Sequence, residues 1–188
     1  MAYVVVYDAC VLHDPAVRDL LIRCATKRQL NLRARWTREI LDEMVRSIIE
    51  RRADLDPLRL ERTRDLMVES VPDCLVTGYE PLIDGLVLPD PKDRHVLACA
   101  IRAEAQAIIT FNLRDFPPEA LAPYDVEAVH PDEFVLGLIG ISEAVVAATF
   151  SELVADLTKP PSTLSEALAT FRTRGLARTA DALAGVLT

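Results

Sequence analysis

Several acidic and amide side chains follow apolar runs that are typical of buried strands. Asp8 comes directly after residues 4–7 (VVVY), and Asn112 and Asp115 follow the short apolar run 107–110. In open α/β sheets, ligands bind outside the carboxyl ends of the strands, so these side chains are expected to lie at one edge. Their oxygen atoms are suited to holding a hard divalent cation at that edge.

Two further carboxylates are predicted to reach the same edge. Asp93 opens a predicted helix after the apolar run 86–88, and Glu43 lies about two turns inside the helix that follows Trp36. Acidic groups that converge on one edge repel each other and destabilise the fold unless cations balance them. Mg²⁺ needs only a few carboxylates and keeps several waters, so the pattern predicts a Mg²⁺ site, with Mn²⁺ as the alternative ion.

Each of these residues also has an ordinary structural explanation when it is taken alone. An Asp at a strand end shapes a turn or caps a helix, which covers Asp8 and Asp93. Glu43 fits an exposed helix face, and Asn112 and Asp115 are common loop formers. The metal site is therefore predicted from the set and not from any single position.

The elements that would position these side chains alternate between strand-like and helical patterns. Strands are predicted at 3–7, 31–36, 107–110 and 126–129, with a partly extended segment at 82–88. Helices are predicted at 15–28, from the Thr37 cap onward, at 57–70 and at 93–105. This alternation predicts an α/β fold with a mostly parallel central sheet.

The chain changes character after His130. Residues 131–188 are predicted to be helical and alanine-rich, interrupted at residues 159–161 (KPP), and Thr163 with Glu166 forms a candidate capping box. We therefore expect two parts, an α/β domain at 1–130 and a helical C-terminal extension at 131–188. The longest apolar run, 134–141, is shorter than a membrane span, so no membrane association is expected.

Composition predicts a globular cytoplasmic protein and leaves its binding partner open. The four cysteines are scattered without zinc-like spacing, which favours free thiols in a reducing compartment. The net charge is −8, but residues 1–64 hold 13 Lys and Arg against 10 Asp and Glu, whereas residues 65–188 hold 8 against 19. The arginine-rich first third could meet a phosphate backbone, or it could simply form solvated helix faces.

Four segments taken together resemble the motifs of PIN domains. They are residues 4–12 (VVVYDACVL), 36–43 (WTREILDE), 88–98 (LPDPKDRHVLA) and 110–117 (TFNLRDFP). Their order and spacing fit over about residues 3–130, and the resemblance is closest to the VapC-like toxins of bacterial toxin–antitoxin systems. Some members of that branch have a helical C-terminal extension.

The resemblance implies a PIN-like three-layer α/β/α fold and a metal-dependent endoribonuclease that hydrolyses RNA phosphodiester bonds. Asp8, Glu43 and Asp93 match the acids of the first three motifs, and Asp115 or Asn112 would complete the catalytic site. Many PIN domains carry Asp where this chain has Asn112, so Asp115 is placed slightly ahead as the fourth metal ligand. Asp90 is a further candidate that could instead shape the turn between two prolines.

The resemblance also implies partners: an RNA substrate, a cognate antitoxin protein and a second copy of the chain in a homodimer. Two other side chains were weighed for RNA contacts: His95 is expected to lie on the surface, and Trp36 is expected in the core.

Three alternative functions were compared with the nuclease. A non-catalytic PIN-like module that binds RNA or protein is supported by Asn112. An aspartyl phosphatase would need a second Asp two residues after Asp8, where Cys10 stands, and a receiver domain would need a Lys after a late strand, where Phe111 follows Thr110.

Overall fold

The structure is a computed structural model that describes residues 2–158 and 160–187. Its centre is a four-stranded parallel sheet with the strand order β2-β1-β3-β4. The strands are β1 (Tyr3–Tyr7), β2 (Leu32–Arg35), β3 (Ala107–Ile109) and β4 (Glu127–Val129). The helices are α1 (Ala9–His13), α2 (Pro15–Thr26), α3 (Arg38–Arg51), α4 (Pro57–Ser70), α5 (Glu80–Ile83), α6 (Arg94–Arg102), α7 (Pro118–Leu121), α8 (Pro131–Asp156), α9 (Leu164–Thr173) and α10 (Ala177–Leu187).

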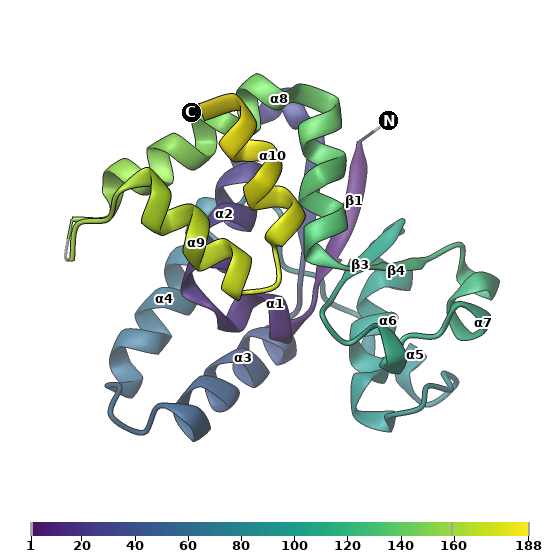
Figure 1. The fold of residues 1–188 in the computed structure, drawn as a ribbon. Helices are drawn as coiled ribbons and strands as arrows, with labels where there is room; N and C mark the ends of the chain where they lie inside the picture. The colour runs from purple at the N-terminus through teal and green to yellow at the C-terminus, as the bar shows by residue number, and fades with distance from the viewer. Residues whose placement is uncertain (1, 159, 188) are drawn as a thin grey trace.

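The strand order reverses direction between β1 and β3. The chain leaves β1 for β2 on one side and later crosses to β3 on the other side. Because parallel crossovers are right-handed, the two connections place α2 and α6 on opposite faces of the sheet. Figure 1 shows this arrangement, with α2 and α8 on one side and α6 on the other. The three-layer α/β architecture expected from the sequence is confirmed.

The core lies on both faces of β1. Val5, Val6 and Tyr7 are fully buried. The Tyr7 ring stacks on Trp36 with the centroids 6.0 Å apart and meets Phe134 of α8 edge-on at 6.1 Å. Trp36 is therefore a core residue, as expected, and the first C-terminal helix packs directly on the same cluster.

Two helices begin at the predicted caps, Thr37 and Thr163, and Asp14 caps a third helix without having been selected from the sequence. Thr37 accepts a hydrogen bond from the Ile40 backbone at the start of α3, and Asp14 accepts from Ala16 and Val17 at the start of α2. Thr163 and Glu166 form the predicted capping box at α9. These caps satisfy backbone donors that have no partner inside the helix.

The partly extended segment expected at 82–88 is wrong at its start, which is helical. Glu80–Ile83 forms the short helix α5, and the residues after it form a loop that has no partner strand among the described residues. Leu86 and Leu88 are buried while Val87 is 81% exposed, so the loop alternates like a half-buried strand. Asp93 therefore follows a loop, not a strand.

The helix α8 is apolar over a longer stretch than the sequence indicated. By length and composition alone, Pro131–Asp156 could cross a membrane, a test that core helices of soluble proteins also pass. Ser142 has non-helical backbone angles and divides α8 into two shorter segments. The second segment is joined to α2 and its C-terminal cap by the ion pairs Arg23–Asp156 and Lys27–Glu152.

Candidate metal centre

Asp8 lies where β1 ends beside β3. Its backbone N–H donates to the Ile109 carbonyl, which fixes the carboxylate next to the end of the neighbouring strand. Asp8 is only 4% exposed, and burial raises the pKa of its carboxyl group. Hydrogen bonds from Thr110 Oγ1 at 2.7 Å and Cys10 Sγ at 3.1 Å oppose that rise, because they stabilise the charged form.

Asp93 ends a single 3-10 turn, Pro91–Asp93, immediately before α6. Its pKa is raised to about 7, first by burial and then by the charges of other acidic groups. Those groups are Asp8, Asp90, Asp115 and Glu43. The charges of all four other carboxylates that the sequence nominated therefore contribute to the raised pKa of Asp93.

Glu43 reaches this region from α3, which packs against α1. Its Oε2 lies 3.2 Å from Nε2 of His95, and Nδ1 of His95 lies 3.9 Å from Glu39. Burial alone would lower the pKa of His95, but the hydrogen bond to Glu43 and the nearby acidic charges outweigh it and raise the pKa. The contact with Glu43 therefore favours the charged form of His95.

The expectation of a surface histidine is wrong, because His95 is only 6% exposed. It is the first of six consecutive buried residues on α6, His95 to Ala100, so this part of the helix is buried on all sides. Glu39 and Glu43 stand four residues apart on α3 and therefore share a helix face. The spacing shows that Glu39 and Glu43 share a face, but it does not identify His95 as their partner.

Thr110 is a site residue that the sequence analysis quoted within a motif but did not select. It is fully buried, donates to Asp8 and accepts a hydrogen bond from the backbone N–H of Asn112 at 2.9 Å. One hydroxyl group thus orients Asp8 and the loop that carries Asn112. A hydroxyl residue at the end of β3, directly beside the strand that carries Asp8, was the signal for this role.

Asn112 and Asp115 have different surroundings. Asn112 lines a cavity of about 200 Å³ together with Glu43 and Cys10. Asp115 ends the 3-10 turn Leu113–Asp115 and acts on the pKa of Asp93. Both predicted residues are thus close to the cluster, and their roles as ligands stay predictions.

The donor set fits a hard divalent cation. Within the described residues, no Lys or Arg forms an ion pair with Asp8, Asp93 or Asp115, so their repulsion is not balanced by the protein. In the same part of the chain, no three His, Cys, Asp or Glu side chains are close enough to form a ready-made cage. Mg²⁺ is commonly bound by one or two carboxylates and several waters, so an open group of oxygen ligands suits it.

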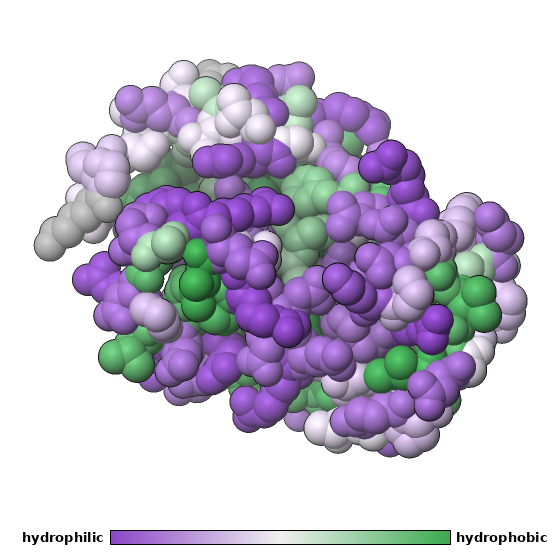
Figure 2. All heavy atoms as spheres, turned by 90° about the horizontal axis from the view of Figure 1, so that it is seen from below, coloured by the Kyte–Doolittle hydropathy of each residue, from purple (hydrophilic) through white to green (hydrophobic). Residues whose placement is uncertain are grey.

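The cluster lies on a polar face of the molecule. β1 runs downward from the N-terminus in Figure 1, so the carboxyl ends of the strands point toward the lower side. Figure 2 views the molecule from that side and shows mainly hydrophilic side chains. The strand ends therefore point toward a mainly hydrophilic face of the molecule.

The comparisons with known proteins agree with this architecture. Residues 4–114 match the family described as PIN domain, and residues 131–185 match the VapC50 C-terminal domain. The chain is 41% identical over 98 residues to a Mycobacterium tuberculosis protein named "Putative ribonuclease VapC50", and the aligned stretch is 50% of this chain and 57% of that protein. No solved structure matches the chain. The PIN match covers more than half of the sequence and includes Asp8, Glu43 and Asp93, so the chain belongs to the PIN-domain family.

Proposed function

We propose that the protein is a Mg²⁺-dependent endoribonuclease whose metal is held by Asp8, Asp93, Glu43 and Asp115. The observation that carries this proposal is the position of Asp8 at the carboxyl end of β1, where its backbone N–H donates to Ile109 and its carboxylate accepts a hydrogen bond from Thr110 at the end of β3. The charges of Asp8, Glu43 and Asp115 also contribute to the raised pKa of Asp93. The region lies where the strand order reverses, which is where open α/β sheets bind their ligands. The name of the M. tuberculosis relative supports RNA as the substrate.

When bound to these carboxylates, Mg²⁺ or Mn²⁺ supplies a water of lowered pKa for attack on phosphorus and compensates the charge of the phosphate. The chain's own residues hold the oxygens in place. Thr110 and Cys10 orient Asp8, and His95 holds Glu43 toward the cluster. The amide of Asn112 can orient a water without adding charge.

Cleavage of labelled single-stranded RNA in Mg²⁺ and in EDTA tests the activity. We expect Mg²⁺-dependent cleavage by the parent and its loss in Asp8→Asn and Asp93→Asn. Asp84→Asn is the matched control, because Asp84 is exposed and does not act on the pKa of Asp93. If Asp8→Asn and Asp93→Asn cleave as fast as Asp84→Asn, the assigned metal site is wrong.

We further propose that the protein is the toxin of a cytoplasmic toxin–antitoxin pair and acts as a homodimer. The match of residues 131–185 to the VapC50 C-terminal domain supports the toxin assignment. Expression in a bacterial host should stop growth, and co-expression of a small protein encoded next to this chain should restore it. Sedimentation of the purified protein tests the dimer.

Asn112 supports a second candidate, a PIN-like module that binds RNA or protein without cleaving it. An Asn in place of an Asp leaves one charge fewer around the metal. Tight binding of RNA with no Mg²⁺-dependent turnover in the cleavage assay would favour this candidate. Cleavage that requires Asp93 would exclude it.

A further inference from the structure

The imidazole ring of His95 is held between two carboxylates of α3. Its Nε2 lies 3.2 Å from Oε2 of Glu43, and its Nδ1 lies 3.9 Å from Oε2 of Glu39. The ring is buried, and Nδ1 forms no hydrogen bond within the part of the chain that the structure describes. Glu39 is thus the group that faces Nδ1 at ion-pair distance, so the orientation of the ring depends on both carboxylates.

Glu39 has a second contact, which fixes its carboxylate. The hydroxyl group of Tyr79 donates to Oε2 of Glu39 at 3.0 Å, and this is the same oxygen that faces His95. Tyr79 is buried, and burial together with the hydrogen bond to Glu39 raises its pKa to about 12. The hydroxyl group therefore keeps its proton at neutral pH and continues to donate to Glu39.

The three side chains come from three parts of the fold. Tyr79 immediately precedes α5, and α5 packs against α6, which carries His95 in its first turn. Glu39 lies in the first turn of α3, the helix that also carries Glu43. The contacts Tyr79–Glu39–His95 therefore tie the loop before α5 and the start of α6 to the helix that presents Glu43.

These contacts engage only one oxygen of Glu43. Oε2 faces His95, whereas Oε1 forms no hydrogen bond or ion pair with the described residues and is left for a cation. The side chains of Glu39 and Glu43 are 45% and 40% exposed, and ion pairs with that exposure contribute little to stability. The main consequence of the network is therefore the orientation of the Glu43 carboxylate.

We propose that Tyr79 and Glu39 are positioning residues that act through His95 to fix the carboxylate of Glu43 at the metal centre. This inference rests on the proposed function, because it takes Glu43 as a ligand of the metal. Groups that orient metal ligands typically contribute ten- to a hundredfold to metal affinity. The loop before α5 thereby takes part in metal binding without contacting the ion.

The affinity of the full-length protein for Mn²⁺, measured without RNA from the electron paramagnetic resonance of free Mn²⁺, tests the positioning directly. Tyr79→Phe removes one hydroxyl group and no charge, and it should raise the Kd for Mn²⁺ about five- to tenfold, as expected for one hydrogen bond to a charged group. Tyr124→Phe is the matched control, because the exposed Tyr124 has no side-chain partner among the described residues. Its Kd should equal that of the parent.

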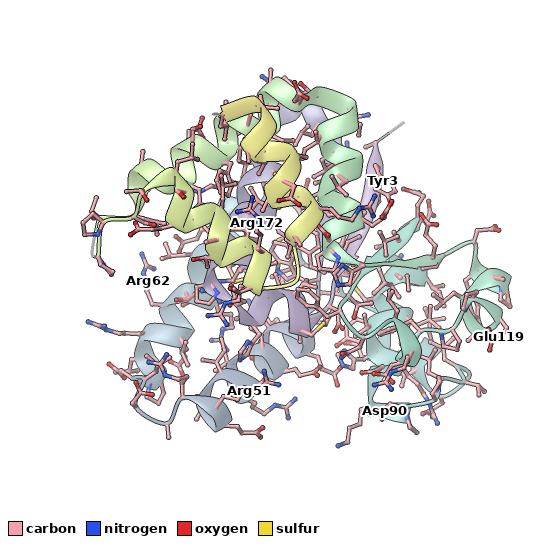
Figure 3. All side chains as sticks on the ribbon, viewed as in Figure 1. Tyr3, Arg51, Arg62, Asp90, Glu119 and Arg172 are labelled. Atoms are coloured by element: carbon pink, nitrogen blue, oxygen red, sulfur yellow. The ribbon has the colours of Figure 1, made fainter. Side chains whose placement is uncertain are left out.

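Glu39→Ala should weaken Mn²⁺ binding about tenfold, and ionic strength separates positioning from loss of charge. A change that is due only to the lost charge should shrink between about 0.1 M and about 1 M KCl, because salt screens exposed charges, whereas a change due to positioning should persist. Glu119→Ala removes the same charge from α7, where Figure 3 shows Glu119 at the outer edge of the molecule, and should leave the Kd unchanged. A Kd for Glu39→Ala that returns to the parent value at about 1 M KCl would contradict its role in positioning.

Double variants test whether the effect passes through His95. Tyr79→Phe should have no further effect on the Kd in Glu39→Ala or in His95→Gln, because either change already breaks the connection to Glu43. If Tyr79→Phe weakens Mn²⁺ binding by the same factor in the parent and in both variants, the hydroxyl group does not act through this network and the proposal is overturned. Glu39→Ala tests the coupling even if His95→Gln does not fold, since Glu39 is exposed.

The outcome is separate from that of the proposed function. If Tyr79→Phe weakens Mn²⁺ binding while the parent cleaves no RNA, the positioning network stands and the nuclease assignment falls. If Tyr79→Phe binds Mn²⁺ like the parent while cleavage requires Asp93, the nuclease stands and the network falls. A lower Tm in Tyr79→Phe with an unchanged Kd would show a purely structural role for the hydroxyl group and would also overturn the proposal.

Discussion

Thr110 connects two strands of the site through one hydroxyl group. It donates to Asp8 at 2.7 Å and accepts from the Asn112 backbone at 2.9 Å. Groups that orient metal ligands in this way typically contribute ten- to a hundredfold to metal affinity or activity. The position of Asp8 thus depends on a neighbour that is not itself a ligand.

Thr110→Val removes this hydroxyl with little change in volume. We expect the Mg²⁺ concentration for half-maximal cleavage to rise about tenfold or more, because Asp8 is no longer held in place. Thr110→Ser should behave like the parent. Thr149→Val is the matched control, since Thr149 is also fully buried but donates to Val145 within α8. An unchanged Mg²⁺ requirement in Thr110→Val would contradict the role given to the hydroxyl.

The raised pKa of Asp93 predicts how pH affects the metal-free protein. A folded-state pKa of about 7 lies above the ordinary value of 3.8, so the folded state retains a proton that the unfolded state has lost. Stability therefore falls as the pH rises from about 4 through about 7. In EDTA, the Tm should be higher at about pH 5.5 than at about pH 8, and Mg²⁺ should restore stability at the higher pH.

Asp93→Asn isolates that dependence from the other carboxylates. The variant cannot lose a proton at this position, so its Tm should fall less between the two pH values than that of the parent. Asp84→Asn should keep the full difference. A pH dependence that is the same in Asp93→Asn and Asp84→Asn would show that the carboxylate cluster does not strain the fold.

At the scale of elements, α9 begins at a complete capping box. Its start is fixed by Thr163, which accepts from the Glu166 backbone while the Glu166 side chain accepts from the Thr163 backbone. Thr163→Ala should lower the free energy of unfolding by about 1 kcal/mol, the usual value of an N-cap. Thr173→Ala, at the exposed end of the same helix, should change it less, as denaturant unfolding would show.

The elements also show what the sequence could predict. Caps and strong periodicity located α2, α3, α4 and α9, because their signals are local. The segment 82–88 was misassigned because alternating burial of Leu86, Val87 and Leu88 arises in a loop as well as in a strand. The kink at Ser142 was not predicted, although Gly140 stands two residues before it and Gly with Ser is a common cause of kinks.

Only the part of the candidate site that has a local signal in the sequence could be predicted. Asp8 was found because a strand end is visible in the sequence. The burial of His95 and its contact with Glu43 depend on how α6 packs on α3, which no local pattern specifies. The partners of the arginines in the first third of the chain could not be predicted from the sequence either. Arg23 pairs with Asp156 and Arg35 donates to the Asp73 carbonyl, whereas Arg51 has no such partner among the described residues.

At the scale of the whole molecule, the C-terminal helices and the PIN domain share one core. Phe134 of α8 packs on Tyr7, and Tyr7 stacks on Trp36. Trp36 is the sole tryptophan, so its fluorescence reports on the PIN domain while circular dichroism reports on all helices. Both signals should change in one coincident transition during denaturation.

Phe134→Ala tests this coupling. The loss of a buried aromatic side chain should lower the free energy of unfolding by about 3–5 kcal/mol and move both signals together. Ile141→Ala, at a position 57% exposed on the same helix, should have little effect. Two separate transitions in the parent would contradict a shared core.

The most direct test of the metal centre is a crystal structure of the parent protein grown with Mn²⁺, whose anomalous scattering locates the ion without assumptions about the ligands. We predict an anomalous peak between Asp8 and Asp93, with Glu43 in contact directly or through water. The map would also show whether Asp115, Asn112 or Asp90 completes the coordination. A fully ordered cluster with no peak at these residues, or a peak elsewhere on the molecule, would contradict the central claim.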